Sequence, residues 1–213
     1  MSYKLFELYY NPKIIGKKNI PDNGPTILCG NHLDELDFKL VKCATKRDIV
    51  WFDNNLVEAK KQLENNGVVG IFPEGVINIY RLLQFKIMNL EQEIIRINNS
   101  KHMRGTDCMT EVARLQTKIA KEFQNIDLIK KQLSLRGIKV NDFDVILPFG
   151  NESINLALEF GAKIVPFALT NNYYFRSKDL KIFFGNSYEP QGNDKEEKYN
   201  LEEKVRKLIY KNF

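Results

Sequence analysis

Short apolar runs alternate with amphipathic segments along most of this 213-residue chain. The apolar runs, such as "TILCG" and "GVVGIF", have the length and composition of strands buried on both faces. The segments between them carry apolar residues at the three- and four-residue spacing of a helix. We predict strands at residues 26–30, 48–52, 67–72, 143–149, 162–169 and 180–185, and helices at residues 1–13, 34–46, 55–65, 151–160 and 201–213. This order predicts an α/β fold with a mostly parallel sheet flanked by helices.

Residues 80–142 interrupt the alternation. Apolar residues at helical spacing run from Ile87 to Ile97 and again from Met109 to Leu133, and the polar stretch 98–105 separates the two groups. We therefore predict a single domain over residues 1–213 that contains an inserted helical hairpin.

The predicted hairpin is basic, with twelve Lys or Arg against six Asp or Glu between Tyr80 and Lys139, whereas the whole chain has a net charge of +5. A local positive surplus suits an anionic partner such as a membrane surface. The solvated faces of two long helices, or an arm for packing or oligomerisation, explain the same charge equally well.

The composition excludes several classes of protein. A hydrophobic share of 43% with 28% charged residues is that of ordinary globular chains. The apolar runs fall well short of the roughly 18 residues that span a bilayer, so we expect a soluble or peripheral protein. The first thirteen residues lack the pattern of a signal peptide. Three widely spaced cysteines, Cys29, Cys43 and Cys108, predict reduced thiols in a cytoplasmic protein and no metal site.

One candidate site is the stretch "NHLDELD" at residues 31–37. Positions five apart on a helix point about 140° away from each other, so His32 and Asp37 pair only if His32 lies in the turn before the helix. A carboxylate on one ring nitrogen would leave the other nitrogen free as a base. The alternative is an acidic first helical turn, in which Asp34 and Glu35 are the capping acids.

A second candidate site, "FPEG" at residues 72–75, follows a buried strand directly. Open α/β sheets bind ligands at the carboxyl ends of their strands, and Glu74 there can hydrogen-bond a polar substrate, while Gly75 permits close backbone approach. The plain alternative is a turn with a solvated glutamate.

Taken together, these segments resemble the glycerophospholipid acyltransferase family, the enzymes similar to 1-acyl-sn-glycerol-3-phosphate acyltransferase. Asn31, His32 and Asp37 match the family's first motif, NH followed by four residues and D. Residues 72–75 match its FPEG motif, and Val165 with Pro166 match a later strand motif. The resemblance covers residues 13–77 and 145–170.

The resemblance implies transfer of a fatty acyl group from a thioester donor, acyl-CoA or acyl carrier protein, to the hydroxyl of a lysophospholipid such as 1-acylglycerol-3-phosphate. It implies His32 as general base and Asp37 as the residue that orients it. It implies no metal or redox cofactor. Apart from the resemblance, we expect peripheral contact with the anionic inner face of the cell membrane, where residues 3–10 could lie in the interface or simply pack on the sheet, and no nucleic-acid partner. The substrate-binding residues that it implies are Asn31, Phe72, Pro73, Glu74, Gly75 and Pro166.

The sequence departs from the family pattern where the acceptor phosphate is expected to bind. FPEG continues in the family with Thr and Arg, but here Val76, Ile77 and Asn78 follow. The basic residue expected between the two motifs is also missing. No spacing selects among the candidate phosphate contacts, which are Arg47, Arg81, Lys86 and Arg104.

Two other functions stay open on these residues. The missing basic residues favour a catalytically impaired member of the family that binds lipid or a protein through the basic hairpin. Nucleic-acid binding through the same hairpin is disfavoured, because no recognised motif accompanies the charge.

Overall fold

The structure is a computed structural model of the chain. It describes residues 3–52, 55–75, 77–100, 106–138, 140, 145–170, 173, 175–176 and 180–212. The chain forms two compact units, one made of residues 1–78 with 145–213 and the other of residues 79–144.

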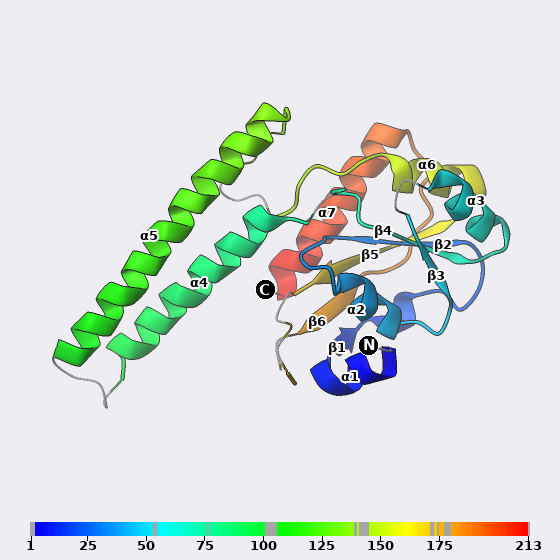
Figure 1. Cartoon of the computed structure of the whole chain (residues 1–213). Helices are drawn as coiled ribbons and strands as arrows, with labels where there is room; N and C mark the ends of the chain where they lie inside the picture. The colour runs from blue at the N-terminus through cyan, green and yellow to red at the C-terminus, as the bar shows by residue number, and fades with distance from the viewer. Residues whose placement is uncertain are drawn as a thin grey trace. The chain divides into compact units, whose positions relative to one another are not determined.

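The first unit is an α/β body, drawn in Figure 1. Its strands are β1 (Lys13–Ile15), β2 (Thr26–Gly30), β3 (Ile49–Trp51), β4 (Val68–Ile71), β5 (Lys163–Leu169) and β6 (Lys181–Phe184). Its helices are α1 (Tyr3–Tyr10), the short 3₁₀ helix η1 (Lys17–Asn19), α2 (Asp37–Cys43), α3 (Leu56–Glu64), α6 (Glu152–Phe160) and α7 (Asp194–Asn212).

Within the described residues the strands form one sheet in the order β1-β6-β5-β2-β4-β3. All neighbouring pairs are parallel except β5 and β6, which are antiparallel. The predicted α/β fold with a mostly parallel sheet is confirmed. Because β2, β3, β4 and β5 run in the same direction, the loops that follow them meet at one edge of the sheet.

Both faces of the sheet are buried, as the apolar runs predict. Along β2, Ile27 and Cys29 pack into one core with side chains of α3, α6 and α7, whereas Leu28 packs into a second core with α1 and α2. This alternation is the two-residue period of a strand covered by a helical layer on each face (Figure 1).

The prediction of a strand at residues 143–149 is corrected by the structure. Residues 145–149 belong to no strand, although Val145, Ile146 and Phe149 are buried. The backbone N–H of Leu147 donates to the Glu74 carboxyl group (3.3 Å), and that of Phe149 donates to Glu202 (3.0 Å). Side-chain carboxyl groups therefore satisfy a buried backbone that the apolar pattern assigned to a sheet.

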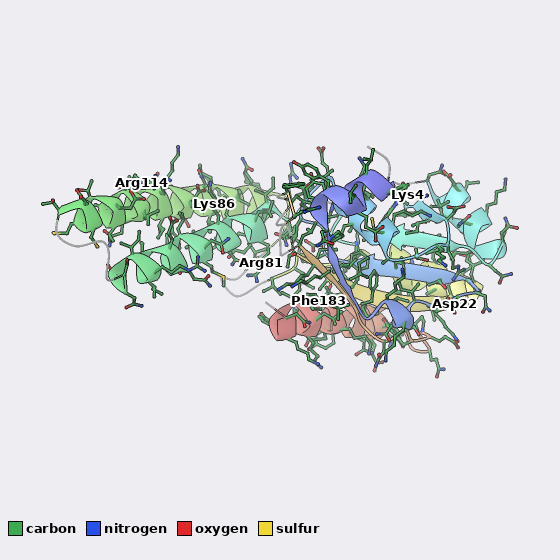
Figure 2. All side chains as sticks on the ribbon, turned by 90° about the horizontal axis from the view of Figure 1, so that it is seen from below. Lys4, Asp22, Arg81, Lys86, Arg114 and Phe183 are labelled. Atoms are coloured by element: carbon green, nitrogen blue, oxygen red, sulfur yellow. The ribbon has the colours of Figure 1, made fainter. Side chains whose placement is uncertain are left out.

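The second unit is a pair of helices, α4 (Ile79–Asn98) and α5 (Thr106–Leu135), at the positions of the predicted hairpin. Tyr80, Ile87 and Ile126 form its small apolar core. An ion pair between Lys86 of α4, labelled in Figure 2, and Glu122 of α5 joins the two helices. None of the helices that the structure describes has both the length and the apolar composition needed to cross a bilayer.

Candidate active site

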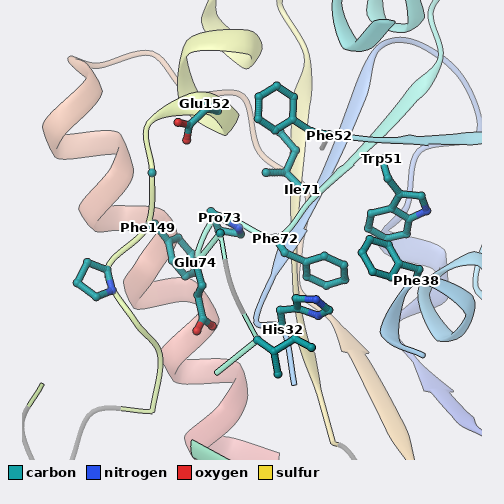
Figure 3. A pocket seen from close by; sticks show the side chains of 14 residues that line it. His32, Phe38, Trp51, Phe52, Ile71, Phe72, Pro73, Glu74, Phe149 and Glu152 are labelled. Carbon is teal, nitrogen blue, oxygen red and sulfur yellow. The ribbon is translucent and has the colours of Figure 1, made fainter. Parts of the chain in front are cut away.

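The two sequence motifs meet at the edge of the sheet where β2 and β4 end. They border an open pocket of about 730 Å³, shown in Figure 3. His32 follows β2, and Phe72, Pro73, Glu74 and Gly75 follow β4; all five line this pocket. The backbone N–H of Asn78 donates to the carbonyl oxygen of His32 (2.8 Å), which ties the two loops together.

His32 and Asp37 are in contact. Nδ1 of the His32 ring lies 3.0 Å from Oδ2 of Asp37. His32 precedes α2 in a turn, and Asp37 is the first residue of that helix, so the five-residue separation is bridged by a turn as the sequence requires. The backbone N–H groups of Leu33 and Asp34 donate to the same Oδ2 atom at 2.6 and 2.8 Å. The turn therefore folds around the Asp37 carboxylate.

The prediction that Asp34 and Glu35 cap the helix is corrected by the structure. The residue that precedes α2 is Leu36, and it makes no side-chain cap. Asp34 instead accepts a hydrogen bond from the backbone N–H of Leu36 (2.8 Å) within the turn. The helix begins three residues later than predicted because Asp37 is the acid that receives the N–H groups at this turn.

The opposite oxygen of Asp37 contacts a residue that the sequence motifs do not include. Tyr173, in the segment after β5, donates its hydroxyl to Oδ1 of Asp37 at 2.5 Å. The Asp37 side chain is fully buried, so a negative charge there depends on these donors. In the sequence, the one signal for Tyr173 is its position after the carboxyl end of a buried strand.

An aromatic wall holds the imidazole ring. The Phe72 ring stacks on His32 (4.2 Å between centroids) and on Trp51 (5.1 Å), and Phe38 meets His32 edge-on at 5.3 Å (Figure 3). Trp51 lies flat against the strand because Gly70 carries no side chain; a Cβ there would lie 2.4 Å from its ring. With Nδ1 directed at Asp37, Nε2 is the nitrogen left for chemistry in the pocket.

Glu74 is buried at the pocket wall, with 8% of the residue exposed. Its Oε2 atom accepts the Leu147 N–H. Burial raises the pKa of the Glu74 carboxyl to about 8, opposed by hydrogen bonds from Leu147, Asn78 and the His32 backbone. Burial therefore favours the protonated form of this carboxyl group at the pocket wall.

The remaining FPEG residues shape the loop. Gly75 has a φ of 69°, a left-handed conformation that favours glycine, and its N–H closes the turn onto the Phe72 carbonyl at 3.0 Å. The Pro73 carbonyl accepts the N–H of Gly150 (2.8 Å), which fixes the loop to the segment before α6.

Two predicted substrate-binding residues lie elsewhere. The Asn31 side chain accepts the Leu169 N–H (2.8 Å) and donates to the Leu169 carbonyl (3.4 Å), so it extends the pairing of β2 with β5. Pro166 is in the middle of β5, where its ring packs beside Gly185. Neither lines the pocket, and substrate contact stays a prediction for both.

Arg47, a predicted phosphate contact, is engaged with backbone and side-chain oxygens of the chain. Its guanidinium donates to the carbonyl oxygens of Pro21, Gly24 and Asn66 and to the Thr26 hydroxyl. Thr26 is the first residue of β2, so this cluster lies at the end of the strand opposite His32. Arg47 joins loops at the amino-terminal edge of the sheet.

The other candidate phosphate contacts belong to the second unit. Arg81 donates to Gln84 (3.1 Å) on the same helix, Lys86 pairs with Glu122, and Arg104 lies outside the described residues. The described residues that line the pocket carry two carboxyl groups, Glu74 and Glu152, and no lysine or arginine. Across the described residues, no three His, Cys, Asp or Glu side chains are grouped so that they could hold a metal ion.

Neither protein-family models nor curated protein sequences gave a match to this chain. Its fold is similar to the crystal structure of the 1-acyl-sn-glycerophosphate (LPA) acyltransferase PlsC from Thermotoga maritima, with a TM-score of 0.55. The match covers 98% of this chain and 79% of that chain at 13% sequence identity. At this identity the likeness shows the fold, and it confirms at that level the resemblance that the sequence motifs indicated.

Proposed function

We propose that this protein is an acyltransferase that moves a fatty acyl group from a thioester donor to the hydroxyl of a lysophospholipid. The observation that carries the proposal is the buried contact of His32 Nδ1 with Asp37, which leaves Nε2 as the unengaged nitrogen of a ring that lines the pocket. The fold that it shares with an acyltransferase supports the same reaction class.

In the proposed reaction, Nε2 of His32 accepts the proton of the acceptor hydroxyl as its oxygen attacks the thioester carbonyl carbon. Asp37 holds the ring and stabilises the imidazolium that forms. The C–S bond then breaks, and the imidazolium returns the proton to the departing thiolate. The sum is one ester and one free thiol, with no further reactant.

The pocket walls suit the two substrates of this reaction. Phe38, Trp51 and Phe149 offer apolar surface for an acyl chain, and Glu74 adds a polar group to the pocket lining for the acceptor. Acyl-CoA and acyl carrier protein fit the proposal equally as donors.

We also propose that the protein works in the cytoplasm, peripheral on the inner face of the cell membrane. Helix α1 supports this contact because Leu5, Leu8 and Tyr9 are exposed on it next to Lys4 (Figure 2). An exposed apolar and basic helix can lie in the boundary of an anionic bilayer.

The test is an acyl-transfer assay with a panel of lysophospholipid acceptors and both types of thioester donor. His32→Ala should lower kcat by about 10²- to 10⁴-fold, the usual contribution of a general base. His102→Ala is the matched control, because it removes the other histidine of the chain and should leave kcat unchanged.

Equal turnover by the wild type and His32→Ala would refute the assignment of the base. Binding to anionic vesicles with no turnover for any acceptor would favour the second candidate, a catalytically impaired lipid-binding protein. The specific observation behind that candidate is the pocket lining, whose described residues carry carboxyl groups where the family is expected to bind phosphate.

A further inference from the structure

The Asp37 carboxylate receives hydrogen bonds from two separate parts of the chain. Its Oδ2 atom takes the donors of its own turn, namely the His32 ring and the backbone N–H groups of Leu33 and Asp34. Its Oδ1 atom takes the hydroxyl of Tyr173, which is 136 residues away in the sequence. The local turn therefore fixes one oxygen, and a distant side chain fixes the other.

Tyr173 is held in this position by α1. Its ring meets Tyr10 edge-on at 5.7 Å and lies 6.3 Å from the ring of Phe6, which is fully buried. Close by in the sequence, the backbone N–H of Arg176 donates to the carbonyl of Tyr9 (2.9 Å), and the Phe175 ring packs against that of Tyr9. The packing fixes the ring, so the hydroxyl has little freedom to leave Asp37.

The phenol can act here only as a donor. Burial and the negative charge of Asp37 raise the pKa of Tyr173 far above its usual range, so it keeps its proton at every physiological pH. A buried carboxylate oxygen without a donor is costly, and the carboxylate would turn or recruit water to satisfy it. Turning the carboxylate would move Oδ2 away from the His32 ring, and a recruited water would hold Oδ1 less firmly than the packed phenol does.

We propose that Tyr173 is a positioning residue: its hydrogen bond to Oδ1 of Asp37 locks the carboxylate, and thereby the His32 imidazole, in the orientation that turns Nε2 toward the pocket. This role rests on the proposed acyl transfer, because the orientation matters only if His32 is the base. In this arrangement α1 is the support of the catalytic pair, through its packing on the Tyr173 ring.

The first test compares Tyr173→Phe with Tyr10→Phe. Both variants remove one hydroxyl from the same aromatic cluster and keep both rings, but only Tyr173 donates to Asp37. We expect Tyr173→Phe to lower kcat about 10-fold or more with KM changed by less than about twofold, because a lost hydrogen bond to a charged group is worth that much in rate. Tyr10→Phe should keep the wild-type kcat.

The second test does not depend on turnover. In protein labelled with ¹⁵N-histidine, the Nδ1 proton of His32 that bonds to Asp37 should give a protected downfield NMR signal. We expect Tyr173→Phe to broaden or abolish that signal, Tyr10→Phe to retain it, and Asp37→Asn to abolish it. If the proposed function fails and no acyl transfer is found, this signal alone still decides whether Tyr173 orders the pair.

One outcome would overturn the proposal: a Tyr173→Phe variant with unchanged kcat and an unchanged His32 signal. If the melting temperature of that variant also falls, Tyr173 is a purely structural residue. Phe6→Leu loosens the ring without removing the hydroxyl, and it should weaken the signal less than Tyr173→Phe does.

Discussion

Asp37 and Arg47 of the α/β unit are held differently from Arg114 of the helical hairpin. Asp37 is buried and takes donors from its own turn and from Tyr173, and Arg47 bonds to residues 19 to 26 positions away in the sequence. Arg114 pairs with Glu111 one turn away on the same helix, with side chains 51% and 29% exposed. The first two charges join distant parts of the chain, whereas the Arg114 pair lies on a surface.

The largest effect should come from removing the buried acid. Asp37→Ala leaves the donors of Leu33, Asp34 and Tyr173 without their acceptor, and we expect it to lower the free energy of unfolding by about 3 kcal/mol. Acyl transfer should fall as far as in His32→Ala. Urea unfolding followed by circular dichroism measures the first effect, and the acyl-transfer assay measures the second.

Asp37→Asn separates these two consequences. The amide keeps an oxygen for the N–H groups of the turn, so it should cost less stability than alanine, but it carries no charge to stabilise an imidazolium. An Asn variant with full activity would remove Asp37 from the mechanism and leave it a purely structural residue.

The next effect in size concerns Arg47. Arg47→Ala leaves three carbonyl oxygens and the Thr26 hydroxyl without their shared donor, and we expect a loss of about 2 kcal/mol in unfolding free energy. Because the cluster lies at the end of β2 opposite His32, kcat and KM of the folded variant should stay at wild-type values. A raised KM for phosphate-bearing acceptors alone would instead support the prediction that Arg47 is a phosphate contact.

A pH-dependent effect is expected for Glu74. The pKa of this carboxyl is about 8 in the folded protein against 4.5 for an unperturbed glutamate, so the folded state binds the proton more tightly than the unfolded chain does. The stability that this provides is complete below pH 4.5 and is lost as the pH rises toward 8.

Glu74→Gln keeps the shape of the neutral side chain and cannot ionise. Unfolding free energies measured in urea at about pH 5.5 and about pH 8 should therefore differ less in the variant than in the wild type. Conversely, an equal loss of stability with pH in both proteins would mean that Glu74 is ionised in the folded state.

The helices and strands with a strong apolar period could be predicted from the sequence. The contact between His32 and Asp37, which depends on a turn, could be predicted as well. His32 and Asp37 are recognisable because a helix cannot bring positions five apart together, so the motif itself requires the turn that the structure has. Residues 145–149 were predicted as a strand because burial alone makes the same apolar pattern, and the carboxyl groups that satisfy their backbone are distant in sequence.

The same limit explains why the motif matches did not reveal the contacts that Asn31 and Pro166 make in the structure. Asn31 and Pro166 belong to motif matches, but their neighbours are the backbone of β5 and Gly185, which no local pattern reveals. The motif matches missed Tyr173 because its hydrogen bond to Asp37 spans 136 residues of the sequence. Local spacing predicts helices and strands, whereas the role of a residue depends on its contacts with distant parts of the chain.

The smallest effect should come from the hairpin surface. Arg114→Ala breaks the ion pair with Glu111 (Figure 2), but both side chains are solvated, and alanine is at least as good a helix former as arginine. We expect the melting temperature to change by less than about 1 °C and acyl transfer to stay at the wild-type rate. Differential scanning calorimetry together with the acyl-transfer assay measures both. A large loss of turnover in a variant that melts normally would contradict the comparison, because it would mean that the exposed charge of α5 meets a substrate, a carrier protein or a lipid surface during the reaction.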